Sequence, residues 1–137
     1  PQVVDAVSIP VIASGGIMDG RGIAAALALG AQAVQLGTAF LSCAEAGTSD
    51  VHRQALADET TLTRVLTGRL ARAVRTPIVD SLESAGVEPP DYPLPRLFLT
   101  DPPMLAGQGG RLARRLPAGE LIASLEAETT GVLSRLA

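Results

Sequence analysis

The sequence predicts an α/β fold in which two short parallel strands flank one helix. Residues 9–13 form an apolar run with several β-branched side chains, which is typical of a strand buried on both faces of a sheet. Residues 33–36 fit a second short buried strand, and the interval between the two has the length of a right-handed βαβ crossover. Within that interval, Asp19 is a suitable N-cap and Gly30 a suitable stop for a helix of small residues. We therefore expect two neighbouring strands of a parallel sheet.

Helices are expected to dominate the rest of the chain. One should follow Thr38 as far as Gly47, and another should cover residues 51–57. Residues 60–66 are rich in β-forming side chains and fit either a strand or an extended arm.

Prolines mark the remaining boundaries. Residues 76–77 (Thr-Pro) and 101–102 (Asp-Pro) each combine a cap residue with a proline at the first helical position, so each pair predicts the start of a helix. Residues 88–95 hold four of the ten prolines and should form an extended surface connection. Pro117 should open a final amphipathic helix.

Composition excludes several classes of function. A net charge of −3 and the absence of Lys argue against an electrostatic nucleic-acid role, and Phe40, Tyr92 and Phe98 are too few for a base-stacking platform. No apolar stretch approaches the ~20 residues of a membrane span, and no cluster of metal ligands is present. Cys43 is the single cysteine, which rules out an internal disulfide and predicts a reducing, cytoplasmic setting.

The length of the chain limits the architecture. A chain of 137 residues suits one ordinary domain, whereas a (β/α)₈ barrel takes ~250 residues. The chain begins with Pro1, and its first residues read as the end of a helix that leads into a strand. We therefore expect the carboxyl-terminal part of a larger protein. Residues 1–47 should hold the two strands and a ligand site, and residues 48–137 a mostly helical extension. On this interpretation, a missing amino-terminal half or another chain completes the fold.

The two strand ends carry glycines that fit a phosphate site. Gly15 and Gly16 follow the first strand, while Gly37 and Thr38 follow the second. Because the carboxyl ends of parallel strands meet at one edge of a sheet, their bare backbone N–H groups should face one anion. A single Gly-Gly pair is more often a tight turn, but the two corners together favour phosphate. The helix that follows should add its N-terminal dipole.

Other candidate residues have ordinary structural explanations as well. Gln35, at the end of the second strand, fits both a cofactor contact and an amide bonded to backbone. Arg21 could reach the anion, although a solvated side chain is the simpler interpretation. His52 lacks a partner motif and should have a surface or capping role, and Cys43 should be a buried filler. A loose basic run, which is usually a solvated face, consists of Arg64, Arg69, Arg72 and Arg75. The sequence leaves open the roles of Arg64, Arg69, Arg72 and Gln108.

Four separated segments carry a family resemblance. They read PVIASGGIMDGRG (10–22), GAQAVQLGTAFL (30–41), TTLTR with TGRLAR (60–64 and 67–72) and MLAGQ (104–108). Together they closely resemble the nitronate monooxygenases, formerly called 2-nitropropane dioxygenases. The resemblance spans nearly the whole chain. It implies the carboxyl-terminal part of an FMN-binding TIM (β/α)₈ barrel, with this chain supplying the last two strands and a helical extension.

The resemblance also implies roles for residues. Gly16 and the run Gln35-Leu36-Gly37-Thr38 would hold the phosphate and ribityl end of FMN, with Gly15 in the same corner. The family oxidises alkyl nitronates with dioxygen to carbonyl compounds and nitrite, without NAD(P)H. Its catalytic histidine lies in a segment that would precede Pro1, and His52 does not match it. No catalytic residue is therefore expected in this chain.

Two alternatives stay open. The related FMN-dependent enoyl-acyl carrier protein reductases share the strand motifs and the late Ala-Gly-Gln turn, but they take hydride from NAD(P)H. A non-catalytic barrel fragment, which binds a phosphate ligand or packs on a partner, is the second alternative.

Overall fold

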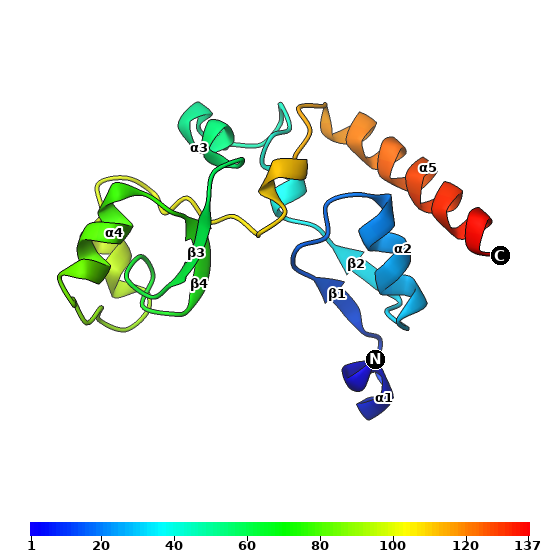
Figure 1. Ribbon diagram of the computed structural model, residues 1–137, viewed down its shortest axis with the longest axis horizontal. Helices are drawn as coiled ribbons and strands as arrows, with labels where there is room; N and C mark the ends of the chain where they lie inside the picture. The colour runs from blue at the N-terminus through cyan, green and yellow to red at the C-terminus, as the bar shows by residue number, and fades with distance from the viewer. The chain divides into compact units, whose positions relative to one another are not determined.

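The computed structural model describes residues 1–137, which form two compact units (Figure 1). The first unit combines residues 1–49 with residues 112–137, and the second consists of residues 50–111. None of the helices has both the length and the apolar character needed to cross a membrane.

The first unit is built on a parallel βαβ motif. Strand β1 (Ile12–Ser14) pairs with β2 (Ala33–Gln35), and helix α2 (Gly20–Ala28) connects them. The short helix α1 (Gln2–Ala6) precedes β1. The side chain of Asp19 accepts hydrogen bonds from two backbone N–H groups in the first turn of α2, as its sequence position predicts. The predicted βαβ unit is therefore confirmed.

The two-stranded sheet is not buried on both faces, contrary to the prediction from its apolar runs. Ile12 is 60% exposed. Ser14, Ala33 and Gln35 are exposed as well, and they occupy the positions that alternate with the half-buried Ala13 and Val34. Neither strand has a second neighbour in the sheet. The apolar side chains of these strands are thus typical of a buried sheet, but residues 1–137 do not bury them.

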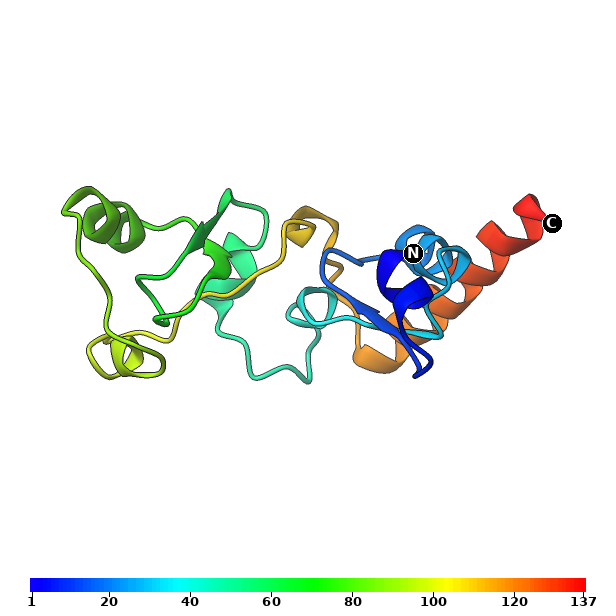
Figure 2. The same cartoon turned by 90° about the horizontal axis from the view of Figure 1, so that it is seen from below.

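Helix α5 (Ala118–Leu136) packs along α2 in the first unit (Figures 1 and 2). Its buried Leu121 and Leu125 form a core with Cys43, and Leu36 packs against this core. Burying one leucine side chain stabilises a fold by about 1.5–3 kcal/mol. The final helix, expected within the extension 48–137, therefore shares a compact unit with the two strands.

One 3₁₀ turn, η1 (Thr38–Phe40), stands where the sequence predicts a helix as far as residue 47. The backbone N–H groups of Cys43 and Ala46 donate to carbonyl oxygens three residues earlier, at 3.0 and 3.2 Å. Such i to i+3 bonds close tight turns in place of an α-helix. The carboxylate of Glu45 in this segment accepts a hydrogen bond from the first amide of α5 at 3.0 Å. The segment thereby supports the start of that helix.

The second unit contains an antiparallel hairpin of β3 (Thr60–Thr63) and β4 (Ala71–Val74). The β-rich segment 60–66 is thus a strand over its first four residues. Helix α3 (Asp50–Ala55) precedes the hairpin, and α4 (Pro77–Ser84) follows it. The core of this unit consists of Val65, Leu66, Ala73 and Val79.

The prediction that a helix starts at residues 101–102 is wrong, because the chain that follows pairs with β4 at residues 104–106. The Val74 amide donates to the Met104 carbonyl at 2.9 Å, and the Ala106 amide donates to the Arg72 carbonyl at 3.3 Å. These bonds hold the backbone extended. The proline-rich connection 88–95 is largely exposed, as predicted, but it is not extended throughout, because a turn at residues 92–93 and the 3₁₀ turn η2 (Leu94–Leu97) form its second half. A further turn, η3, covers residues 110–112.

Candidate functional site

The two glycine corners lie side by side at one edge of the β1–β2 sheet. Ser14, the last residue of β1, is aligned with Gln35, the last residue of β2. The Ser14 hydroxyl donates to the Gln35 carbonyl at 3.2 Å, which ties the two strand ends together. Adjacent strands lie about 4.8 Å apart. Gly15 and Leu36 therefore leave the sheet as neighbours, so the two corners can serve one ligand.

Each corner presents backbone with little side-chain cover. Gly15 and Gly16 have φ of +102° and +70°, in the region that glycine adopts most readily. Gly37 has an ordinary φ of −108°, so glycine is needed at this position for its lack of a side chain and not for its backbone conformation. A Cβ atom at Gly15 or Gly37 would meet no heavy atom within 4 Å. An approachable pair of glycine corners is a donor set that suits a phosphate group.

The other predicted residues of the second corner differ in what they contribute. Gln35 is exposed at the end of β2, where its amide is accessible to a ligand. Leu36 packs instead against the core of Leu121 and Leu125, so its side chain anchors the corner. Thr38 is the first residue of η1 and is half-buried. Because the Leu36 side chain is used in this packing, Leu36 could face a bound group only with its backbone.

The N-terminus of α2 is closed by protein carboxylates. The Asp19 side chain accepts hydrogen bonds from the Arg21 and Gly22 amides at 3.0 and 3.2 Å. The Gly20 amide donates to Glu128 Oε2 at 3.0 Å. The next amide along, at Ile23, donates to the Asp19 carbonyl at 3.2 Å. The expectation that this helix end serves the anion is therefore corrected, because its backbone amides already donate to groups within the protein.

Each of these two carboxylates is paired with an arginine. Asp19 Oδ2 lies 2.5 Å from Arg21 Nη2, and Glu128 Oε1 lies 2.5 Å from Arg114 Nη1. The hydrogen bond from Arg21 holds the pKa of Asp19 below its usual value. The Gly20 amide, followed by Arg114 and Ser124, does the same for the pKa of Glu128. Both groups are thus charged near neutral pH, and both charges are locally balanced.

Sequence reasoning missed Glu128. Its main backbone partner, Gly20, lies 108 positions away in the chain. A glutamate in a helix with ordinary neighbours carries no local signal of such a contact. Asp19, whose partners lie two and three residues ahead, could be identified by a capping rule.

The contacts of the sole histidine and the sole cysteine fit structural roles. His52 Nε2 lies 3.1 Å from the Leu105 carbonyl in the second unit. Cys43 is 1% exposed, and burial raises the pKa of its thiol. A buried thiol with a raised pKa is a poor nucleophile. No group of three or more His, Cys, Asp and Glu side chains could hold a metal ion.

Most of the arginine run is engaged in contacts within the second unit. The Arg69 guanidinium stacks over the Tyr92 ring at 4.5 Å, and Arg72 donates to Thr60 at 3.3 Å. Arg75 forms ion pairs with Glu59 and Asp80. These contacts favour the structural interpretation of the run. Gln108, whose role the sequence leaves open, is exposed.

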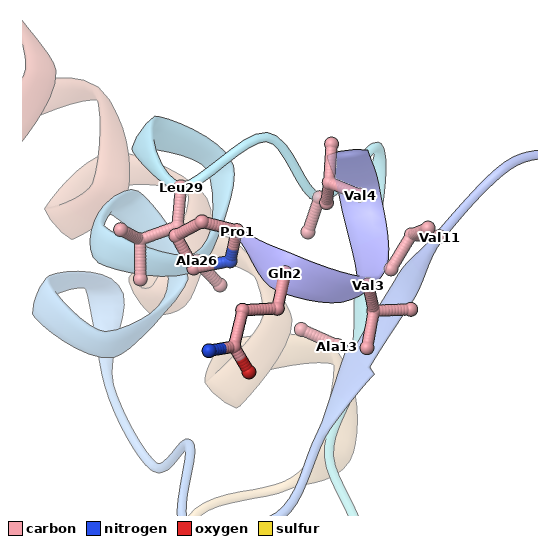
Figure 3. A pocket seen from close by; sticks show the side chains of 9 residues that line it. Pro1, Gln2, Val3, Val4, Val11, Ala13, Ala26 and Leu29 are labelled. Carbon is pink, nitrogen blue, oxygen red and sulfur yellow. The ribbon is translucent and has the colours of Figure 1, made fainter. Parts of the chain in front are cut away.

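An apolar groove of about 520 Å³ lies elsewhere in the first unit (Figure 3). It is formed by α1, β1 and the end of α2, and Figure 3 shows Val3, Val11 and Ala13 beside one another at its wall. None of the six predicted site residues lines it. The full lining consists of Pro1, Gln2, Val3, Val4, Val11, Ala13, Ala26, Leu29 and Ala31.

Comparison with known proteins gives one consistent result. The family model described as nitronate monooxygenase matches residues 1–128. A nitronate monooxygenase of Pseudomonas aeruginosa is 44% identical over 142 residues, covering 90% of this chain and 40% of that protein. A probable nitronate monooxygenase of Staphylococcus saprophyticus is 35% identical over 152 residues, covering 98% of this chain and 43% of the relative. The chain thus spans about two fifths of the length of these relatives.

Two solved structures are similar over almost the whole chain. The crystal structure of a nitroalkane oxidase from Streptomyces ansochromogenes superposes with a TM-score of 0.91 at 40% identity, covering 99% of this chain and 44% of that one. FabK from Thermotoga maritima gives a TM-score of 0.81 at 31% identity, covering 98% of this chain and 49% of its own.

Proposed function

Because the chain belongs to the nitronate monooxygenase family, we propose that it serves the FMN-dependent oxidation of alkyl nitronates by dioxygen to carbonyl compounds and nitrite. The family model covers 128 of the 137 residues, and this match is the observation that carries the proposal. The likeness to a nitroalkane oxidase, at a TM-score of 0.91, supports the same class of nitrogen-containing substrate.

The proposed fold of the complete enzyme is a (β/α)₈ barrel in which β1 and β2 are the last two strands. Three observations support it: the parallel βαβ unit, the exposed face that includes Ile12, and the greater length of the relatives. The remaining strands would cover the exposed face and pair with the open edges of the sheet. They would come from the rest of the barrel or from another chain.

The proposed share of this chain in the reaction is to bind the cofactor. Backbone amides at Gly15, Gly16, Gly37 and Thr38 would hold the FMN phosphate, and Gln35 would bind a polar edge of the cofactor, with Leu36 anchoring the corner from behind. When bound, FMN would supply the redox chemistry that carries electrons from the nitronate to dioxygen. The catalytic histidine is expected outside these residues, so no proton transfer is assigned to this chain.

The test uses protein purified from the complete reading frame. We expect flavin absorption bands in the visible spectrum, and stoichiometric formation of nitrite from an alkyl nitronate under air without NAD(P)H. Gly47→Val is a matched control for a valine substitution at Gly37, since a Cβ atom at either glycine meets no heavy atom within 4 Å. Absence of both flavin and nitrite formation would contradict the proposal and favour a non-catalytic fragment.

The likeness to FabK favours a second candidate function, the FMN-dependent enoyl-acyl carrier protein reductase named above. The two candidates share a phosphate site and differ in the electron donor. Oxidation of NADPH by an enoyl thioester, with no nitrite from nitronate, would select the reductase. Nitrite formation with no such NADPH oxidation would select the monooxygenase.

A further inference from the structure

We propose that Glu128, on α5, is a positioning residue for the phosphate group of FMN. The proposal rests on the proposed FMN site at the two glycine corners. Glu128 would not touch the cofactor. It would act by fixing the start of α2 and, with it, the loop of residues 15–19 that carries the first corner.

Both oxygens of the Glu128 carboxylate are engaged. Oε2 accepts the hydrogen bond from the Gly20 amide at 3.0 Å. Oε1 accepts from Arg114 Nη1 at 2.5 Å and from the Ser124 hydroxyl at 3.1 Å. A carboxylate held at both oxygens cannot turn away from the amide without losing charge-assisted bonds. The contact is therefore a fixed point between α5 and α2.

The packing around Gly20 shows how closely the two helices meet. A Cβ atom at Gly20 would lie 2.4 Å from Glu128 Cβ and 2.5 Å from the Thr129 amide nitrogen. Gly20 is also buried. The first residue of α2 thus lies directly against the backbone of α5, and only glycine fits there.

The loop between the sheet and this fixed point is short. Ser14 is held by its pairing with Gln35, and residue 20 is held by Glu128, which leaves residues 15–19 in between. Two of the five are glycines, whose backbone freedom is costly to restrict. Ordering one residue costs about 1–2 kcal/mol, so a loop held before FMN arrives binds more tightly than a free one.

Helix α5 also supports the second corner. Leu36 directly precedes Gly37 and packs against the core that contains Leu121 and Leu125. One helix therefore holds both corners of the proposed site, the first by a hydrogen bond and the second by apolar packing. Because α5 supports both corners, a substitution on α5 should change the affinity for a ligand that spans them.

The sign of the effect separates positioning from simple charge. If Glu128 were only a negative charge near the anion, its removal would strengthen FMN binding, since Arg114 and the Gly20 amide would be released. If it holds the loop, its removal weakens FMN binding. The loss should be confined to ligands that carry the phosphate.

The experiment compares FMN with riboflavin, which lacks the phosphate, in protein from the complete reading frame. Dissociation constants are measured by quenching of flavin fluorescence, at a temperature where circular dichroism shows each variant folded. Glu128→Ala should lose about tenfold in FMN affinity and less than about twofold in riboflavin affinity. Glu128→Gln keeps the volume and one acceptor, so its loss should be about threefold. Glu126→Ala, on an exposed position of the same helix, should change neither.

The outcomes are distinct. A wild-type protein that binds FMN no better than riboflavin overturns the proposed phosphate site itself. A wild type that prefers FMN, together with a Glu128→Ala variant whose preference is unchanged or larger, overturns the role of Glu128 alone. If Glu128→Ala does not fold, an unchanged preference in Glu128→Gln is sufficient to overturn it. A general loss of stability would lower both affinities together and leave their ratio unchanged, which also contradicts positioning.

Discussion

Gly37 and Gly16 should respond differently to a valine, because only one of them needs a positive φ. Gly16 has φ +70°, so a branched side chain would strain the backbone there. Gly37 has φ −108° and open space where a Cβ would stand, so Gly37→Val should fold normally while its side chain blocks the anion. We expect FMN affinity to fall at least about tenfold, with an unchanged midpoint of thermal unfolding. Gly47→Val should leave both properties unchanged, and an unaltered FMN affinity in Gly37→Val would count against the phosphate assignment.

Glu128 should make the stability of the protein depend on pH in acid. Its pKa lies below the ordinary value of 4.5 in the folded protein, chiefly because the Gly20 amide donates to the charged form. A lowered pKa stabilises the folded state above the ordinary value, and this stabilisation is lost as pH falls through and below it. The free energy of unfolding of the wild type should therefore exceed that of Glu128→Gln most near neutral pH. The difference should shrink between about pH 5 and pH 3.

Urea unfolding of both proteins at several pH values measures this difference. Asp19 also has a lowered pKa, but it is present in both proteins and cancels from the comparison. A gap between the two proteins that stays constant with pH would show that the carboxylate charge of Glu128 contributes nothing.

Local chemistry explains which parts of the candidate site could be predicted from sequence. Gly15, Gly16 and the Asp19 cap follow one another within a few residues, so their types and spacing carry the information. The parallel pairing of β1 with β2 follows from the βαβ pattern, whereas the register that aligns Ser14 with Gln35 is known only from the structure. Glu128 joins the site only through tertiary packing, and nothing near it in the sequence indicates this.

At the level of elements, the contact between α2 and α5 gives opposite expectations for two helical glycines. Gly20→Ala places a methyl group 2.4 Å from Glu128 Cβ, which should destabilise the protein by about 1–3 kcal/mol. Gly131→Ala, within α5, meets nothing closer than 3.8 Å, so better helix propensity should stabilise by about 0.5–1 kcal/mol. Chemical denaturation of both variants measures these values. Equal effects would mean that the two helices do not meet at Gly20.

The elements that sequence rules predicted poorly are those where tertiary pairing decides. A cap residue followed by proline predicts a helix at 101–102, yet the neighbouring backbone pairs with β4 through Met104 and Ala106. The sequence of residues 60–66 fits either a strand or an extended arm, and pairing with β4 makes the first four of these residues a strand. Helix α2 was predictable from its local Asp19 cap, and α4 from Pro77 at its first position, although the Thr76 side chain makes no capping hydrogen bond.

At the level of the whole molecule, the uncovered face and open edges of the β1–β2 sheet should govern how the 137-residue chain behaves by itself. Open strand edges and exposed apolar side chains promote association. We expect sedimentation velocity of the isolated chain to show self-association that grows with concentration. A monomer that unfolds cooperatively at every concentration would contradict this expectation.

Ile12→Lys distinguishes an exposed face from a covered one. In the isolated chain, where Ile12 is 60% exposed, a lysine should reduce self-association. In protein from the complete reading frame, where we propose that this face is covered, the same change should lower the thermal midpoint because a charge would be buried. An unchanged midpoint there would argue against the proposed barrel.

The discontinuous make-up of the first unit has a consequence for biosynthesis. Gly20 leaves the ribosome long before its partner Glu128, since 108 residues separate them. At about 5–20 residues per second, that interval lasts about 5–20 s. During this interval the start of α2 lacks the Glu128 contact, and residues 50–111, which form the second unit, are synthesised before Glu128. The nascent βαβ motif therefore acquires its contact with Glu128 only after residues 50–111 have been synthesised.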